Sequence, residues 1–215
     1  MNTFLHDYIT ALQKVLDQLP PDEMKRVVEE ILAAGERGST IFILGNGGSA
    51  ATASHFACDL AKGTQQPGQR PFRVIALTDN VPLITAWGND TAYDRIFAEQ
   101  LRPLVQPDDL VIGISGSGNS PNVLEAMRVA RNGGARTIGW TGFRGGKIKD
   151  MVDVCISVPS HSTEQIEDAH LILEHAVCTT LRKVRSLKGI YPAERGASSD
   201  QPMPAYPDPF VIRGA

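Results

Sequence analysis

The chain has 215 residues, 42% of them hydrophobic and 21% charged, which is enough for one sizeable core in a single domain. Its formal net charge of -3 argues against the strongly basic surface that binds a nucleic-acid backbone, and no apolar run approaches the ~20 residues of a membrane span. We therefore expect a cytoplasmic protein with no nucleic-acid partner and no membrane segment.

The first 35 residues predict two helices that precede any strand. Apolar residues recur at helical spacing between Phe4 and Leu19, and a Pro-Pro-Asp run at residues 20–22 opens a second amphipathic helix through Ala34. These helices have no strand of their own to cover, so their apolar stripes pack either on the sheet or on another subunit. We favour contacts between subunits.

Apolar runs and helical patterns alternate through the rest of the domain. We expect strands over residues 40–44, 72–77, 110–114, 135–140 and 152–158. We expect helices over residues 49–62, 81–101 (interrupted at 88–90), 120–131 and 163–187. This order predicts an α/β fold, a three-layer sandwich with a mostly parallel sheet flanked by helices.

The last stretch of the chain differs from the rest in composition. Residues 189–215 contain five prolines and little periodicity, which indicates either a disordered tail, the interpretation we favour slightly, or an arm that wraps a partner. We therefore predict a single domain over residues 1–188, divided into a helical pair at 1–35 and an α/β core at 36–188. A Pro-rich C-terminal tail follows at 189–215.

Two loops rich in glycine and serine each follow an apolar run and open a helix. They are Gly-Asn-Gly-Gly-Ser at residues 45–49 and Ser-Gly-Ser-Gly-Asn-Ser at residues 115–120, the serine loop. Both present amides and hydroxyls at a helix N-terminus, where phosphate binds, and both fall at the carboxyl ends of strands. The serine loop has no P-loop lysine, so a sugar phosphate is a better ligand for it than a nucleotide. For residues 45–49 a plain turn is an equal alternative.

Two pairs of ionisable residues on the helices are candidates for metal binding or proton transfer near these loops. His55 and Asp59 lie four residues apart on one helix face, where they can share a metal or a proton-transfer task, or form a plain surface pair. Glu167 and His175 lie eight residues apart, about 80° around the last helix and roughly 12 Å along it. This is long for direct ligation of one ion, so it indicates either side chains leaning together or a site between two subunits.

Taken in order, these motifs resemble the SIS (sugar isomerase) domain family in its phosphoheptose isomerase branch. The matching segments are residues 45–49, 55–57, 88–90, 114–120, 141–146 and 166–175, and the likeness extends from the N-terminal helices to about residue 187. The resemblance implies a five-stranded parallel sheet, a homotetramer and one zinc ion, Zn²⁺, per subunit. It also implies conversion of sedoheptulose 7-phosphate to D-glycero-D-manno-heptose 7-phosphate for the heptose of lipopolysaccharide.

The resemblance also assigns roles to single residues. The substrate-binding positions are Asn46, Gly47, Gly48, Ser49, Asp59, Asn89, Asp90, Ser115, Gly116, Ser117, Ser120 and Glu167. The metal positions are His55, Asp59, Glu167 and His175. The catalytic positions are Asp59 as base and His175 as acid, because an enediol isomerisation needs one group to move a carbon-bound proton and another to move protons between oxygens. A metal would polarise both oxygens.

Three of these positions depart from the family pattern: Asp59 stands for Glu, Glu167 for Gln and Gly116 for Thr. Asp59 is one methylene shorter, and a misplacement of ~1 Å can cost on the order of 10²-fold in rate. Glu167 adds a negative charge that would hold a divalent cation more firmly. The first two changes either compensate each other or mark an isomerase of another sugar phosphate.

The leading hypothesis is an enzyme, an aldose-ketose isomerase of the phosphoheptose type. The first alternative is a non-catalytic SIS scaffold, such as the regulator of replication initiation that binds DnaA. That protein lacks a carboxylate at the position of Asp59, which favours the enzyme. Two further alternatives are an isomerase of another sugar phosphate and a binding module that responds to a sugar phosphate without converting it.

Overall fold

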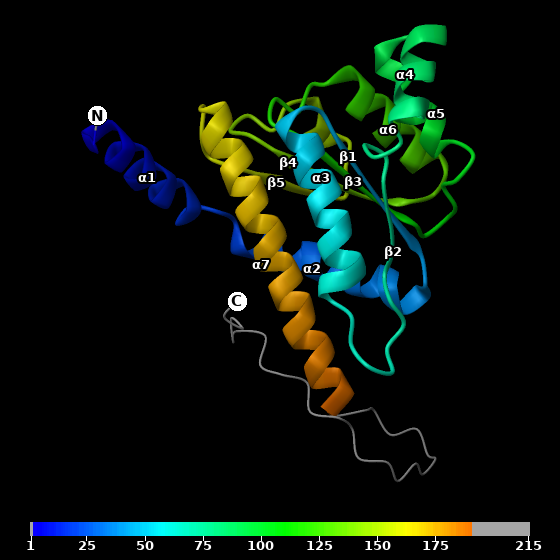
Figure 1. The fold of residues 1–215 in the computed structure, drawn as a ribbon, viewed down its shortest axis with the longest axis horizontal. Helices are drawn as coiled ribbons and strands as arrows, with labels where there is room; N and C mark the ends of the chain where they lie inside the picture. Colours follow the sequence, from blue (N-terminus) through cyan, green and yellow to red (C-terminus); the bar gives the residue numbers. More distant parts are fainter. Residues whose placement is uncertain (1, 191–215) are drawn as a thin grey trace, which may run out of the picture.

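The structure, a computed structural model, describes residues 2–190 and centres on one parallel sheet (Figure 1). The five strands are β1 (Thr40–Gly45), β2 (Arg73–Ala76), β3 (Leu110–Ser115), β4 (Arg136–Thr141) and β5 (Val154–Ser157). Their order is β2-β1-β3-β4-β5, and all neighbours pair in parallel. The predicted α/β fold with a five-stranded parallel sheet is confirmed.

The winding of the sheet reverses between β1 and β3. β2 lies on one side of β1, whereas β3, β4 and β5 follow on the other side. The connections that leave β1 and β3 at their carboxyl ends therefore diverge, and open α/β sheets bind ligands in the crevice that results. Residues 45–49 and the serine loop are these two connections.

Helices cover both faces of the sheet and complete the three-layer sandwich. In chain order, the helical segments of the described residues are α1 (Asn2–Leu16), α2 (Pro21–Arg37), α3 (Gly48–Cys58), η1 (Asp59–Gly63), α4 (Val81–Asp90), η2 (Tyr93–Arg95), α5 (Ala98–Leu101), α6 (Pro121–Asn132), η3 (Lys147–Asp150) and α7 (Thr163–Ile190), of which α1 does not lie on the sheet. Successive strand residues face opposite layers: Ile41 and Ile43 pack with α2, α3 and α7, whereas Phe42 and Leu44 pack with α5 and α6. This double burial fixes β1, and with it the loop that follows.

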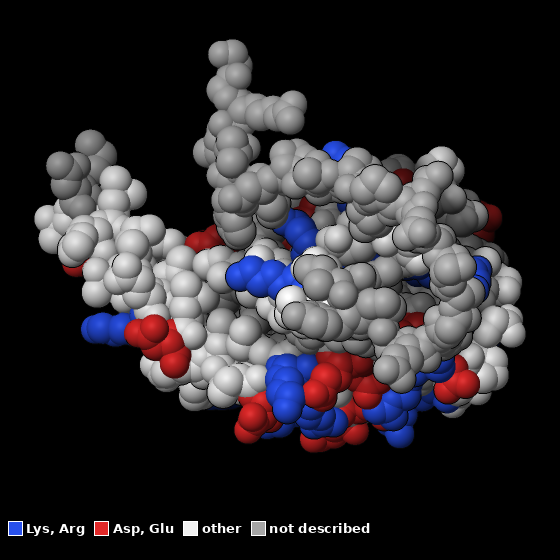
Figure 2. Space-filling view, turned by 90° about the horizontal axis from the view of Figure 1, so that it is seen from below, with Lys and Arg blue, Asp and Glu red and all other residues white. Residues whose placement is uncertain are grey.

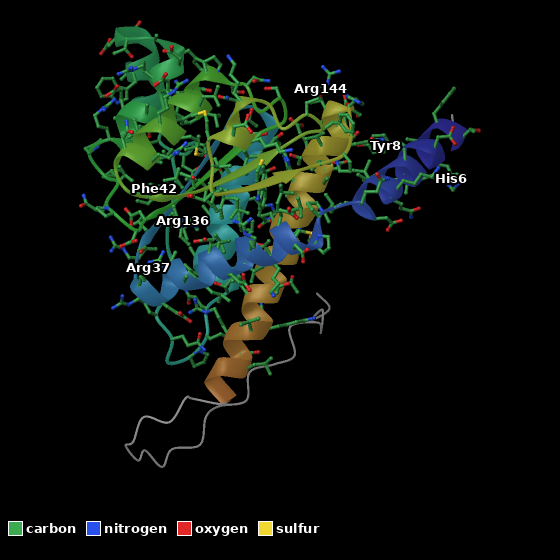
Figure 3. All side chains as sticks on the ribbon, turned by 180° about the vertical axis from the view of Figure 1, so that it is seen from behind. His6, Tyr8, Arg37, Phe42, Arg136 and Arg144 are labelled. Carbon is green, nitrogen blue, oxygen red and sulfur yellow. The ribbon has the colours of Figure 1, made fainter. Side chains whose placement is uncertain are left out.

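The two leading helices have different surroundings. Val27 and Ile31 of α2 are fully buried in the cluster that covers the sheet, so these two residues pack on the sheet and not, as we had favoured, on another subunit. α1 instead projects from the body of the molecule and contacts α7 (Figure 1). Tyr8 points from α1 toward α7 (Figure 3), and its hydroxyl donates a 2.5 Å hydrogen bond to Asp168. Phe4 of α1 stays 78% exposed.

Two predicted helices differ in detail from the structure. The helix expected over residues 49–62 changes at Asp59 into a π-helical turn, η1. The interruption expected at residues 88–90 falls later, because α4 runs through Asp90 and the chain turns at Thr91. Apart from residues 189 and 190, which continue α7, the predicted tail lies outside the described residues.

The surface carries charges of both signs. Figure 2 shows acidic and basic side chains interspersed along one edge of the molecule rather than separated into two regions. Among residues 2–190, no helix is both long and apolar enough to cross a membrane.

Candidate active site

A cavity of about 450 Å³ lies where β1 and β3 end. Both predicted loops line it, through Asn46, Ser49, Ser115, Gly116, Ser117 and Ser120. Glu167 and Ile166 of α7 form another wall, and Arg144 and His161 come from the connections on either side of β5. Figure 3 places Arg144 at the end of the molecule where α7 begins. The structure thus brings together seven of the predicted substrate-binding residues.

Backbone contacts hold the serine loop in place. The amide of Gly142 donates to the carbonyl of Gly116 at 2.8 Å, and Gly118 adopts a φ of 63° against the backbone of Gly145. Ser120 occupies the N-cap of α6 without a capping hydrogen bond from its side chain, and its hydroxyl lies 3.0 Å from that of Ser115. The loop therefore offers hydroxyls at the positive end of a helix dipole, which suits an anion.

Residues 45–49 also form more than a plain turn. The amides of Asn46 and Asn122 exchange hydrogen bonds of 2.9 and 2.8 Å, and the Tyr93 hydroxyl donates to Asn46 at 3.1 Å. These contacts fix a polar side chain in the cavity wall. Gly47 has a φ of 55°, which favours glycine, and neither it nor Gly48 is among the residues that line the cavity.

Glu167 lies against the first turn of α3. A Cβ added at Gly48 would overlap the Glu167 carboxylate, so only glycine leaves room for it there. A carboxylate in this position offsets the positive end of the α3 dipole. The N-termini of α3 and α6 are therefore electrostatically different, because the serine loop contains no acidic residue.

A second group of polar side chains lies farther along α3, which runs beside α7 (Figure 1). One ligand atom from each of His55, Asp59, Glu174 and His175 lies within 4.8 Å of the others. Asp59 Oδ1 is 3.9 Å from Nε2 of His55, and Glu174 Oε2 is 3.3 Å from Nε2 of His175. We call these four residues the α3–α7 cluster. Three of them were predicted as metal ligands.

Glu174 is the member that the sequence did not reveal. It directly precedes His175, and adjacent residues of a helix do not normally face the same way. Helical spacing therefore did not predict that Glu174 and His175 share a site. The available signal was an acidic residue directly after the apolar run Leu171-Ile172-Leu173. Glu167, the predicted fourth ligand, lies outside this cluster and in the cavity wall instead.

The α3–α7 cluster fits a divalent cation. The side chain of Glu174 is fully buried, and its Oε2 atom makes no hydrogen bond. Burial, together with the negative charge and hydrogen bond of Asp59, raises the pKa of Glu174 to about 8. His55 and His175 are about half exposed, so an ion can enter from solvent. Two imidazoles and two carboxylates are a donor set that zinc accepts.

Two further predicted residues lie elsewhere. Asn89 and Asp90 are exposed at the end of α4, where the amide of Asn89 donates to Asp90 at 2.8 Å. Neither is among the residues that line the cavity, so their role in substrate binding stays a prediction.

Comparisons with known proteins agree with this architecture. Residues 4–142 match the SIS domain family. The chain is 42% identical over 157 residues to the phosphoheptose isomerase of Roseiflexus sp. (strain RS-1), an alignment that covers 73% of this chain and 79% of that protein. It is 43% identical over 170 residues to that of Aliarcobacter butzleri, covering 78% and 88%. The structure of phosphoheptose isomerase GmhA from Neisseria gonorrhoeae superposes with a TM-score of 0.79 at 31% identity, covering 85% of this chain and 98% of that one.

Proposed function

The chain belongs to the SIS domain family, and from this we propose that it is a phosphoheptose isomerase. It interconverts sedoheptulose 7-phosphate and D-glycero-D-manno-heptose 7-phosphate, an aldose-ketose isomerisation. The observation that carries the proposal is the α3–α7 cluster, which combines an acid-base pair with a cation-binding donor set. Both of the helices that contribute to it, α3 with its continuation η1 and α7, begin beside the cavity. The names of the similar proteins support the choice of substrate.

We place the substrate phosphate at the serine loop rather than at residues 45–49. The loop offers Ser115, Ser117 and Ser120 at the positive end of α6, with no acidic residue among them. At the start of α3 the carboxylate of Glu167 would repel a phosphate, but it can accept hydrogen bonds from sugar hydroxyls. The reacting end of the sugar then points toward the α3–α7 cluster.

Asp59 and His175 carry the proton transfers in this proposal. Asp59 removes the proton from the carbon beside the carbonyl and returns it to the neighbouring carbon, while His175 moves a proton between the two oxygens of the enediol. The π-helical turn that begins at Asp59 supports the idea that its shorter side chain is compensated, because such turns change the local helix geometry and often occur at functional sites.

A divalent cation, which we take to be Zn²⁺, would be held by His55, Asp59 and His175, the three positions common to the resemblance and to the α3–α7 cluster. When bound, it would polarise the carbonyl and hydroxyl oxygens of the sugar. Its donor set supports this assignment, since imidazole and carboxylate are both common zinc ligands.

The remaining parts of the proposal concern the setting of the enzyme. We propose a single SIS domain over residues 1–188, a cytoplasmic homotetramer and a role in supplying heptose for lipopolysaccharide. The exposed apolar side chains of α1, Phe4, Leu5 and Ile9, support association with further subunits. Asn89 and Asp90 stay proposed substrate contacts.

Turnover of sedoheptulose 7-phosphate tests the function directly. The protein is stripped of metal with a chelator, resupplied with Zn²⁺, and the sugar carbons are followed by NMR. We expect conversion that depends on Zn²⁺. Binding of the sugar phosphate without conversion would contradict the proposal and support a scaffold or a binding module, and conversion of a different sugar phosphate alone would reassign the substrate.

A further inference from the structure

Two glutamates of α7 lie in different surroundings although they share a face of the helix. Glu167 and Glu174 are seven residues apart, which places them within about 20° around the axis and roughly 10 Å apart along it. Glu167 lines the cavity and lies against Gly48, whereas Glu174 belongs to the α3–α7 cluster. One carboxylate therefore belongs to each part of the site.

Glu174 is buried with an incomplete set of hydrogen bonds. Its side chain has no exposed surface, and its Oε2 atom makes no hydrogen bond although it lies 3.3 Å from Nε2 of His175. On its other oxygen, the Cys178 thiol is a weak donor at 3.9 Å. An apolar side chain would usually serve the fold as well as a buried carboxyl group with so few donors. A bound cation would supply the contact that Oε2 lacks.

The spacing of the α3–α7 cluster matches the coordination of a small cation. Ligand bonds of about 2.0 Å arranged as a tetrahedron put the ligand atoms about 3.3 Å from one another. Glu174 Oε2 and His175 Nε2 already lie 3.3 Å apart, and Asp59 and His55 lie 3.9 Å apart. Small side-chain rotations would bring all four atoms into one coordination shell. Two carboxylates and two neutral imidazoles would also balance the charge of a divalent ion.

We propose that Glu174 is the fourth metal ligand of this site, and that Glu167 faces the sugar instead of the metal. The proposal rests on the metal-dependent function proposed above. It changes one assignment that the family resemblance made, because the carboxylate next to His175 replaces the one eight residues before it. The metal is then held by two helices, His55 and Asp59 from α3 and η1 and Glu174 and His175 from α7.

Metal affinity measured without substrate tests this assignment. The apo forms of the parent protein, Glu174→Met and Glu167→Met are titrated with Zn²⁺ in competition with a chromogenic chelator. The two variants are matched, since each changes one carboxylate of α7 to an unbranched side chain of similar size that carries no oxygen. We expect Glu174→Met to lose at least ~10- to 100-fold in affinity, the loss seen even for residues that act through a ligand. Glu167→Met should stay within about 3-fold of the parent, since its carboxylate is outside the cluster.

Co²⁺ provides a second readout that does not depend on activity. Its visible absorption in the loaded protein reports the coordination shell, so we expect the spectrum to change in Glu174→Met and to be kept in Glu167→Met. If Glu174→Met does not fold, as judged by thermal melting, Glu174→Leu is a second variant that fills the buried volume without offering a carboxylate and should also lose Zn²⁺ affinity.

The outcomes separate this inference from the proposed function. Parent affinity in Glu174→Met and Glu174→Leu, with the loss falling on Glu167→Met, would overturn the assignment and leave the metal site in place. Glu174 would then be a neutral acid hydrogen-bonded to Asp59. A parent protein that binds neither Zn²⁺ nor Co²⁺ would overturn the metal site itself, and this inference with it.

Discussion

The cavity at the sheet edge and the α3–α7 cluster are built by different means. The cavity is made largely by backbone, with the serine loop held by the contact between Gly116 and Gly142 and by the left-handed conformation of Gly118. The cluster is made by side chains of two helices and includes Glu174, a carboxylate without a full set of partners. A rigid backbone frame suits the binding of a group that does not change, whereas a cluster of ionisable side chains suits proton transfer and metal binding.

Replacing the proposed base, Asp59, should give the largest difference between an effect on the α3–α7 cluster and an effect on the cavity. In Asp59→Asn we expect turnover of sedoheptulose 7-phosphate to fall roughly 10²- to 10⁴-fold, the usual contribution of a positioned acid or base. The melting temperature should change little and inorganic phosphate should bind as in the parent, because the cavity does not include Asp59. Undiminished turnover in the variant, measured by NMR with Zn²⁺ present, would remove Asp59 from the mechanism.

His170 lies on α7 between Glu167 of the cavity and Glu174 of the α3–α7 cluster. Its Nε2 atom is 3.3 Å from the Thr141 carbonyl oxygen. Burial lowers the pKa of His170 to about 4 from an ordinary 6.5. As the pH falls, His170 is protonated in the unfolded chain before it is protonated in the folded protein. The free energy of unfolding therefore decreases between pH 6.5 and about 4, by roughly 3 kcal/mol at most.

Chemical denaturation across this pH range measures the effect. His170→Gln keeps a hydrogen-bonding side chain and removes the titration, so its stability should depend less on pH than that of the parent. Parallel profiles for the two proteins would show that another group causes the acid sensitivity.

A pair of glycines in the serine loop tests whether the cavity is a backbone structure. A Cβ at Gly118 would overlap the carbonyl of Gly145 and force a φ of 63° on a side chain, so Gly118→Ala should lose about 1–3 kcal/mol of stability. A Cβ at Gly116 would meet only Ile166, at 3.6 Å, so the melting temperature of Gly116→Ala should match the parent. Similar melting temperatures for both variants would contradict the description of the loop. In the cluster, by contrast, Zn²⁺ affinity should be unaffected by either change.

The smallest effect is expected at α1, away from both regions. Tyr8→Phe removes the hydroxyl that donates to Asp168, a loss of about 0.5–1.5 kcal/mol. Hydrogen exchange should become faster in α1 and stay unchanged in α3. Faster exchange in α3 would show that α1 supports the cluster through α7.

The two regions also differ in how well the sequence predicted them. The serine loop is a local motif between a strand and a helix, so its residues identify the cavity without knowledge of the fold. The cluster joins residues more than 100 positions apart, and its fourth member depends on how α3 packs against α7. Helical spacing alone could place His55 with Asp59, but it could not choose between Glu167 and Glu174. The π-helical turn at Asp59 has no sequence signal that we recognise.

The length of α7 has a consequence for substrate choice. One continuous helix of 28 residues carries both Glu167 and His175, at a rise of about 1.5 Å per residue. The helix therefore fixes the distance between the proposed sugar contact at Glu167 and the proposed acid at His175. A sugar that binds Glu167 through its hydroxyl groups would need a matching length to bring its reacting carbons to His175. Inserting a single residue between the two positions would turn one end by about 100° relative to the other.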